Sequence, residues 1–415
     1  MLDFNPFKDS PEFESRKGTP FSPPQISISE LHAAVPKHLF RKSTAMGLYY
    51  YARDICFIFV AYKLGCTIEP LSQRLAEVYG FGRTIELIFR WLLWVVYWHW
   101  QGVIMGGFWT LAHEAGHGTL SDYNWVNHVI GYTAHTFLLV PYYAWRSTHR
   151  AHHKKTNSLE DDEHYIPRTR SHFGLPPSSQ AHITDYHDIF EETPIYSLLR
   201  LIVMQAIGMH AYLMVNALGS PKYPPGTNHF NPSSPLFKPH ERGAIVASDI
   251  GLGIMMLFLF KFASHFGMGA LFKLYLVPWV WANHWMVAVT FLQHSDPTIP
   301  VYRRQEWNFV RGALSTVDRP VLGWAGRFFF KNASHDHIAH HLFSSIPFYN
   351  QPQVTERIKP LLKNHYNYDS TNTFRALYRS FTQCRFIEDD GDIAFYKNKD
   401  GEAARTVQAV SEVQT

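Results

Sequence analysis

Three segments of the chain repeat histidines at spacings that place imidazole rings on one face of a helix, where they could converge on one point. They are His113 and His117; His149, His152 and His153; and His337, His340 and His341. Imidazole nitrogen is a good ligand for iron, zinc, copper and nickel. One metal ion takes about four to six ligands. Eight histidines therefore predict a site for two metal ions.

A ninth candidate ligand is His294, which follows the last long apolar segment of the chain. Histidines that bind a metal usually donate their other ring N–H to a carboxylate or a carbonyl. Glu114, Asp336 and Asp162 are the acidic residues expected to accept these hydrogen bonds. Asp162 belongs to the acidic run at 160–163, which could equally be a solvated loop.

Other interpretations of the histidines stay open at this point. The segment from His113 to His117 also matches the HExxH signature of zinc hydrolases, in which two histidines bind zinc and the glutamate is the general base. A membrane zinc protease needs only one further ligand, however, and would leave both triplets unexplained. A non-enzymatic membrane receptor with a structural metal is a third possibility. Isolated histidines, such as His135 and His164, are interpreted as packing or hydrogen-bonding residues.

The composition indicates a membrane protein with a large polar part. Apolar residues make up 46% of the 415 residues and aromatic residues 16%, including 12 Trp, yet the mean hydropathy is slightly negative. The formal net charge is +4, and the basic residues are scattered, which argues against nucleic-acid binding. The 3 cysteines form no CxxC pair, which argues against disulfides and thiolate metal sites.

Apolar segments predict a mostly α-helical integral membrane protein, with four transmembrane helices in two hairpins and a cytosolic helical cap that holds the dimetal site. The predicted spans are 47–64, 84–110, 244–262 and 271–292, and the cap comprises 111–243 and 294–395. A helix from 84 to His113 would be roughly 40 Å long, against roughly 30 Å of hydrocarbon, so its histidines should project into water.

The segment 195–218 is expected not to cross, because an even number of crossings must separate histidine segments that share one site. It is interrupted by Arg200 and His210. Basic residues flank the second and third histidine segments, which places them in the cytosol by the positive-inside rule. Residues 1–35 are predicted to be a flexible cytosolic tail and 396–415 a disordered tail.

Taken together, these motifs resemble the membrane-bound fatty acid desaturases, and within them the microsomal acyl-lipid branch of Δ12 (oleate) and ω-3 desaturases. The family pattern HxxxH, HxxHH and [HQ]xxHH is matched by all eight histidines, and the segments 138–142, 311–314 and 340–344 are also similar to that branch. The resemblance covers about 35–395. It departs at Gly118 and Ala151, where plant members often carry His and Arg, which puts regioselectivity in doubt.

The resemblance implies a membrane-embedded desaturase domain over 36–395, with two iron ions and O2 as co-substrate, in the endoplasmic reticulum membrane with the active site facing the cytosol. The implied reaction introduces a cis double bond, with Δ12 desaturation of a phospholipid-linked 18:1 chain as the first choice. An ω-3 or bifunctional Δ12/ω-3 enzyme, or a hydroxylase, is the alternative. The chain contains no fused cytochrome b5-like segment, so cytochrome b5 and its reductase are the implied electron donors. Trp281, Trp285 and Phe291 could line the acyl path or simply pack.

Overall fold

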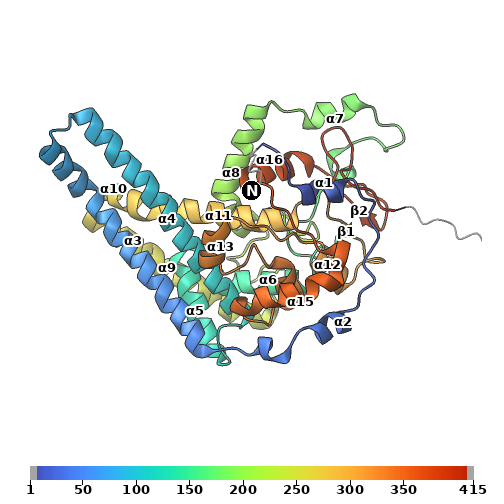
Figure 1. The fold of residues 1–415 in the computed structure, drawn as a ribbon, viewed down its shortest axis with the longest axis horizontal. Coiled ribbons are helices and arrows are strands. Elements are labelled where there is room, and N and C mark those ends of the chain that lie inside the picture. The colour runs from blue at the N-terminus through green and yellow to red at the C-terminus, as the bar shows by residue number, and fades with distance from the viewer. Residues whose placement is uncertain (1–6, 409–415) are drawn as a thin grey trace, which may run out of the picture.

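The computed structural model describes residues 7–408 and is almost entirely helical (Figure 1). The five longest helices are α3 (Thr44–Tyr79), α4 (Arg83–His117), α8 (Pro194–Val215), α9 (Arg242–Phe266) and α11 (Val277–His294). The shorter helices are α1 (Pro11–Lys17), α2 (Ile28–Ala34), α5 (Asn124–Phe137), α6 (Tyr142–Lys155), α7 (Ile183–Phe190), α10 (Met268–Leu271), α12 (Phe309–Leu314), α13 (Gly323–Phe329), α14 (His337–Leu342), α15 (Gln351–Leu362) and α16 (Thr373–Gln383).

Short elements complete the chain. Five 3-10 turns are η1 (Lys37–Phe40), η2 (Ser171–Phe173), η3 (Pro239–Glu241), η5 (Phe348–Asn350) and η6 (Lys363–His365). A π-helical turn, η4 (Phe272–Leu276), joins α10 to α11. Strands β1 (Val301–Tyr302) and β2 (Ile393–Ala394) form one antiparallel pair.

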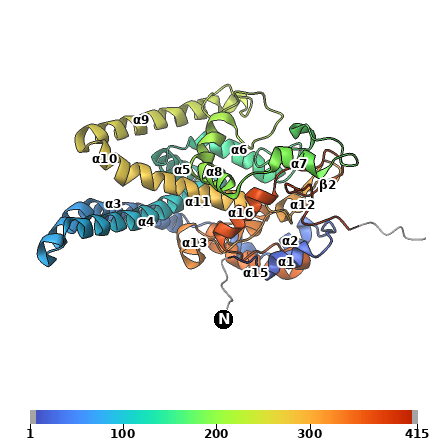
Figure 2. The same cartoon turned by 90° about the horizontal axis from the view of Figure 1, so that it is seen from above.

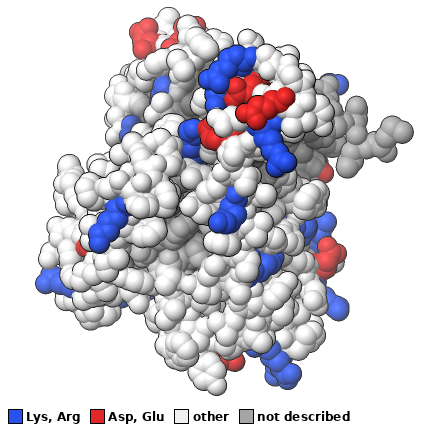
Figure 3. Space-filling model, turned by 90° about the vertical axis from the view of Figure 1, so that its left-hand side faces the viewer, with Lys and Arg blue, Asp and Glu red and all other residues white. Residues whose placement is uncertain are grey.

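Two helical hairpins project from the rest of the molecule. One consists of α3 and α4, and the other of α9 followed by α10, η4 and α11 (Figures 1 and 2). Their outer surfaces carry exposed large apolar side chains, such as Ile254, Phe258 and Phe260 on α9. The face at the end of the hairpins is mostly uncharged, apart from one group of basic and acidic side chains at the upper right and scattered charged side chains elsewhere (Figure 3). Such a surface suits contact with lipid.

Within residues 7–408, three helices are long and apolar enough to cross a membrane: α3, α8, and the helical stretch Pro239–Phe266 that contains α9. Two of them contain the predicted spans 47–64 and 244–262. The third, α8, covers the segment that was expected not to cross. The other two predicted spans, 84–110 and 271–292, lie in α4 and in the segment from α10 to α11. Neither segment is among these three helices. Helix α11 carries two polar residues, Asn283 and His284, within its apolar sequence. The arrangement of four spans stays a prediction.

Glycines on α4 allow its histidine-bearing end to be enclosed by other segments. A Cβ atom at Gly107 would lie 2.6 Å from the carbonyl oxygen of Phe329, and one at Gly102 would lie 2.5 Å from the indole of Trp281. Only glycine permits such a close approach of neighbouring chain. As a consequence, α4 is buried without interruption from Gln101 to Gly116.

The N-terminal part of the chain differs from the predicted flexible tail. From residue 7 onward it is packed on the cap, because α1 and α2 bury Phe13 and Leu31. Ser10 caps α1, and Ser27 forms a capping box with Glu30 at the start of α2. Residues 1–6 lie outside the described residues.

The C-terminal tail predicted over 396–415 also packs on the protein as far as it is described. Phe21 N–H donates to the carbonyl oxygen of Thr406 at 2.8 Å, and Gln408 N–H donates to that of Phe21 at 2.7 Å. Tyr396 is buried. Residues 409–415 lie outside the described part of the chain. The two ends of the described chain pair with each other. Their order therefore depends on a contact between distant residues, which local composition does not predict.

A buried ion pair connects the segment before the third histidine motif to the first hairpin. The Lys331 ammonium donates to Asp54 Oδ2 at 2.6 Å and to the carbonyl oxygen of Gly107 at 2.7 Å. The Lys331 side chain is fully buried, and that of Asp54 nearly so. Arg53 is the second basic partner of Asp54. This contact fixes the segment leading to α14 against α3 and α4.

We expect Lys331→Met to lower the free energy of unfolding by about 3 kcal/mol, because it removes the donor to the buried Asp54 Oδ2 atom and to the buried carbonyl oxygen of Gly107. Thermal unfolding of the detergent-solubilised protein measures the effect. Arg304→Met is the matched control, since Arg304 forms an exposed pair with Asp161 at 3.6 Å. Its loss should change stability by less than about 1 kcal/mol. Equal effects of the two substitutions would contradict the assigned role of Lys331.

Candidate metal centre

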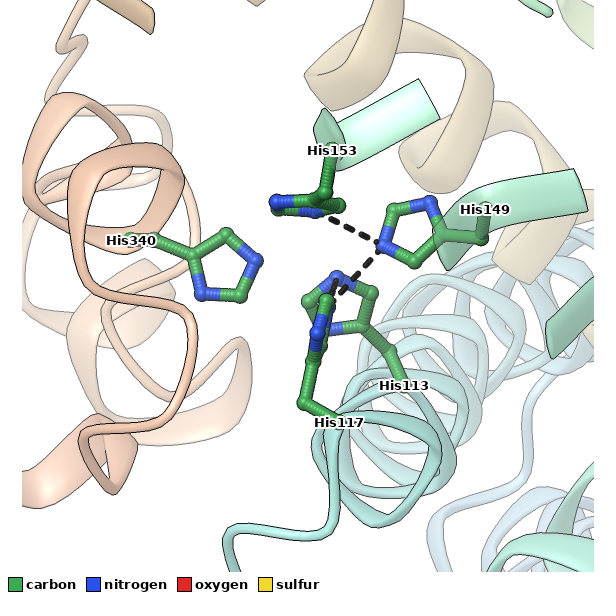
Figure 4. Close-up of side chains that lie close together, drawn as sticks. All are labelled: His113, His117, His149, His153 and His340. Atoms are coloured by element: carbon green, nitrogen blue, oxygen red, sulfur yellow. Dashed lines mark hydrogen bonds between the residues drawn. The ribbon is translucent and has the colours of Figure 1, made fainter. Parts of the chain in front are cut away.

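The structure brings five histidines from three helices together in what we call the five-histidine cluster (Figure 4). Its members are His113 and His117 of α4, His149 and His153 of α6, and His340 of α14. One ring nitrogen of each lies within 4.8 Å of all the others. The Nε2 atom of His149 is 3.1 Å from that of His117 and 3.0 Å from that of His153.

A second group, the three-histidine cluster, consists of His152, His294 and His341, all buried. His294 comes from the end of α11, so a fourth helix contributes to the site. His337 adjoins this cluster, with its Nε2 atom 3.0 Å from that of His294. The two clusters are neighbours, since the rings of His153 and His341 stack with centroids 4.1 Å apart.

The two histidine triplets do not each converge on one point. Adjacent residues diverge, so that His152 and His153 of α6 belong to different clusters, and so do His341 and His340 of α14. Consecutive residues of a helix are about 100° apart around its axis, which lets one helix serve two centres. Helices α6 and α14 therefore each contribute histidines to both clusters.

Two of the three predicted acidic partners contact ring nitrogens. His113 Nδ1 lies 3.1 Å from Glu114 Oε1, and His152 Nδ1 lies 2.7 Å from Asp162 Oδ1. Glu114 Oε1 is also 3.8 Å from His340 Nδ1. A carboxylate can only accept a hydrogen bond, so the Nδ1 atoms of His113 and His152 carry the hydrogen. The Nε2 atoms of these two rings are then left with a free lone pair.

Asp336, the third predicted partner, lies elsewhere. Its Oδ2 atom is 3.1 Å from Arg327 Nη1. Among the residues that the structure describes, its carboxylate forms no ion pair with a histidine of either cluster. Its backbone carbonyl oxygen instead accepts the N–H of His340 within the first turn of α14.

Thr156 is a partner that the sequence analysis missed. Its hydroxyl donates to the carbonyl oxygen of His152 at 2.8 Å, so its oxygen can accept the Nδ1–H of His341 at 3.0 Å. The available signal was positional: Thr156 lies four residues after His152, on the same helix face. A small hydroxyl residue is too common at such positions to have been singled out.

His164, interpreted from the sequence as a packing residue, lies beside the site without joining either cluster. Its ring stacks on that of His152 with centroids 4.9 Å apart. Its Nε2 atom hydrogen-bonds to the hydroxyl of Tyr212, which also donates to Thr148 Oγ1 at 2.9 Å. This polar group connects α8 to the helix that bears the second histidine motif.

The electrostatics of the clusters favour neutral imidazoles. Burial, reinforced by neighbouring histidines, holds the pKa values of His149, His153 and His341 well below their usual range, and lowers the pKa of His340 to about 3. The Nε2 atoms of His340 and His341 are buried and have no hydrogen-bond partner in the described part of the chain. Buried, neutral and unpartnered nitrogens are the donor set that a metal ion requires. Both clusters are thus able to bind metal ions.

An apolar cavity of about 110 Å³ lies against both clusters. Its apolar wall comes mainly from α4, α8 and α11, and includes Trp109, Met204, Gly208, Val287 and Phe291. Its polar end includes His113 and His149 of the five-histidine cluster, and His152 and His294 of the other, together with His337. Of the three aromatic residues considered from the sequence, Phe291 lines the cavity; Trp281 and Trp285 are not among its lining residues.

We expect Asp162→Ala to weaken metal binding about 10- to 100-fold, because His152 loses the carboxylate that orients its ring. Metal retained by the purified protein after dialysis against graded chelator concentrations measures this. Asp161→Ala is the matched control, since Asp161 is half-exposed and pairs with Lys155 at 3.3 Å. Unchanged metal retention in Asp162→Ala would show that Asp162 does not hold the site together.

Comparison with known proteins agrees with this geometry. Residues 89–372 match the family model described as fatty acid desaturase. The chain is 36% identical over 400 residues to a Δ12 fatty acid desaturase of Mortierella alpina, covering 94% of each protein. It is also 36% identical over 409 residues to an oleate hydroxylase of Claviceps purpurea, covering 92% of this chain and 83% of the relative. An endoplasmic reticulum omega-6 fatty acid desaturase of Brassica juncea is 33% identical over 404 residues, covering 96% and 98%.

Proposed function

The chain belongs to the fatty acid desaturase family, and on that premise we propose that it is an O2-dependent acyl-lipid desaturase that converts oleoyl to linoleoyl chains by Δ12 desaturation. The observation that carries the proposal is the apolar cavity whose polar end is formed by both histidine clusters. An alkyl chain in this cavity would lie beside both histidine clusters, whose metal ions could carry out oxidative chemistry. The relatives named Δ12 and omega-6 desaturases support the position of the double bond.

The nine histidines would hold two iron ions, the five-histidine cluster one and the three-histidine cluster with His337 the other. Bound iron would supply the activation of O2 that breaking an unactivated C–H bond requires, since no side chain removes such a hydrogen as an acid or base. Overall, two C–H bonds are lost and O2 is reduced to two molecules of water. The substrate supplies two of the four electrons, so a donor must supply the other two; cytochrome b5 with its reductase is the proposed donor.

The protein's own residues would orient the acyl chain and keep the site dry. Met204 and Gly208 of α8 face Val287 and Phe291 of α11 across the cavity. An apolar wall excludes water and holds an alkyl chain in one register. Glu114, Asp162 and Thr156 hold the imidazole rings in the tautomer that presents Nε2 to the metal.

The proposed setting is the endoplasmic reticulum membrane, with the domain over 36–395 crossing four times and the histidine clusters on the cytosolic side. The apolar outer surfaces of the hairpins and the name of the Brassica juncea relative support this. A phospholipid-linked 18:1 chain is the proposed substrate, because it would reach the cavity from the bilayer.

Alternative activities differ in how well they fit. The oleate hydroxylase of Claviceps purpurea is as similar in percentage identity as the Mortierella desaturase, so fatty acyl hydroxylation is the second candidate, beside ω-3 or bifunctional desaturation. A zinc protease fits poorly. Glu114 would have to act on a water at an open metal position, whereas it is buried between His113 and His340 and accepts a hydrogen bond from Thr119.

Expression in a host that makes only monounsaturated fatty acids tests the reaction. We expect new 18:2 in the host lipids and about two irons per purified chain. A hydroxylated 18:1 product would replace the desaturase proposal with the hydroxylase. One zinc per chain without iron would contradict both. His152→Ala and His294→Ala should abolish the product and lower the iron content while the protein stays in the membrane; full activity of His294→Ala would remove that residue from the ligand set.

Filling the cavity should block the acyl chain without removing metal. A Cβ atom at Gly208 would already lie 3.3 Å from Val287 Cγ1, so Gly208→Leu must project into the seam between α8 and α11. We expect activity to fall more than about tenfold, as for a misplaced substrate, with iron content unchanged. Gly253→Leu is the matched control, because no atom lies within 4 Å of its added Cβ. Equal activity of the two variants would show that the acyl chain does not use this cavity.

A further inference from the structure

A stripe of basic residues runs along one face of α6. Arg146, Arg150 and Lys154 follow one another at intervals of four residues, which places them on the same side of the helix. Arg150 and Lys154 are exposed and Arg146 is partly exposed. We call these three residues the basic stripe.

The basic stripe lacks acidic partners. Within residues 7–408, no ion pair with Asp or Glu involves any of its three members, whereas the neighbouring Lys155 pairs with Asp161 at 3.3 Å. Glu241 is the acidic side chain that acts on Arg146, and it also accepts a hydrogen bond from Ser147 at 2.7 Å. Arg150 and Lys154 therefore present positive charge that no acidic side chain among the described residues pairs with.

Two members of the basic stripe, Arg146 and Arg150, lie close to His117 of the five-histidine cluster. His117 and His149 are the two partly exposed members of the five-histidine cluster; its other members and the whole three-histidine cluster are buried. Arg146 Nε donates to the carbonyl oxygen of Gly116, the residue before His117, at 3.0 Å. Burial and the neighbouring histidines lower the pKa of His117, and the charges of Arg150 and Arg146 lower it further, so both arginines act on this ring.

We propose that the basic stripe is the docking surface for the acidic face of the one-electron carrier protein that reduces the metal centre. The inference rests on the proposed function, in which each turnover needs two electrons beyond the two supplied by the substrate. A reduced carrier would dock twice per turnover, give up one electron each time and leave oxidised. The two protons that complete the two water molecules come from solvent.

Charge and location together select this partner. Complementary charges steer association and raise its rate about 10- to 1,000-fold at low ionic strength. A carrier on the stripe would lie close to His117, a partly exposed member of the five-histidine cluster. The acyl cavity is walled mainly by α4, α8 and α11, so docking on α6 need not interfere with substrate binding.

Charge reversal in the full-length protein, held in nanodiscs of neutral phosphatidylcholine, tests the proposal. The probe is the reduced soluble haem domain of cytochrome b5. For the double variant Arg150→Glu/Lys154→Glu we expect the KM for the carrier to rise at least about tenfold. The kcat at saturating carrier, the KM for the acyl lipid and the iron content should all stay unchanged. Direct binding of the haem domain should weaken in parallel, and raising the ionic strength should weaken it for the parent but scarcely for the variant.

Arg357→Glu on α15 is the matched control. Helices α6 and α15 lie on opposite sides of the cap (Figure 2). Arg357 is exposed and forms no ion pair with the described residues. An unchanged carrier KM in the double variant, or an equal rise in Arg357→Glu, would overturn the proposal. A rise seen only when anionic lipid is added would assign the stripe to lipid headgroups instead. Because carrier binding is measured without turnover, failure of the desaturase assignment itself would be recognised separately, from iron content and product.

Discussion

The structure depends on the burial of many imidazole rings within a few ångströms of one another. A buried polar nitrogen without a partner is costly, and a buried cluster of charged imidazoliums would be more so. The protein meets this constraint by keeping the rings neutral and giving several Nδ1 atoms an acceptor, namely Glu114, Asp162 and Thr156. The Nε2 atoms on the other side of these rings are left for metal ions. Among the described residues, the Nε2 atoms of His340 and His341 have no hydrogen-bond partner. Folding and metal binding are therefore expected to be linked.

Holding these rings requires segments from most of the chain. The glycines of α4 let the segment before α14 pack against it, and Lys331 fastens that segment to Asp54 of α3. Beyond α11, Asp296 pairs with Arg319 at 2.5 Å, and Arg379 of α16 pairs with Asp369 at 2.5 Å. These side chains are almost completely buried. Asp296 also lies 3.5 Å from Arg379, so the loop that follows His294 is connected both to Arg319 and to α16. Buried pairs of this kind fix one geometry more than they add stability.

The relatives show that one scaffold serves several oxidations. A Δ12 desaturase and an oleate hydroxylase share the same percentage identity with this chain. The histidines by themselves do not distinguish these outcomes, because each product begins with breaking an alkyl C–H bond. In the proposed function, the wall formed by α8 and α11 sets the register of the acyl chain, and the basic stripe of α6 receives the electron carrier.

The sequence by itself determined the chemistry of the site. Histidine spacing predicted a site for two metal ions. The position of His294 after an apolar segment predicted it as a further ligand, and Glu114 and Asp162 were predicted as hydrogen-bond acceptors. All these predictions depend on residue type and local periodicity. Only the tertiary structure decided how the triplets divide between two clusters and that both chain ends pack on the cap. It also decided that Thr156 supports His341 and that Asp336 contacts Arg327 and not a histidine. Each of these depends on contacts between residues far apart in the chain, such as Phe21 with Thr406, and local sequence carries no record of which distant surface a residue will meet.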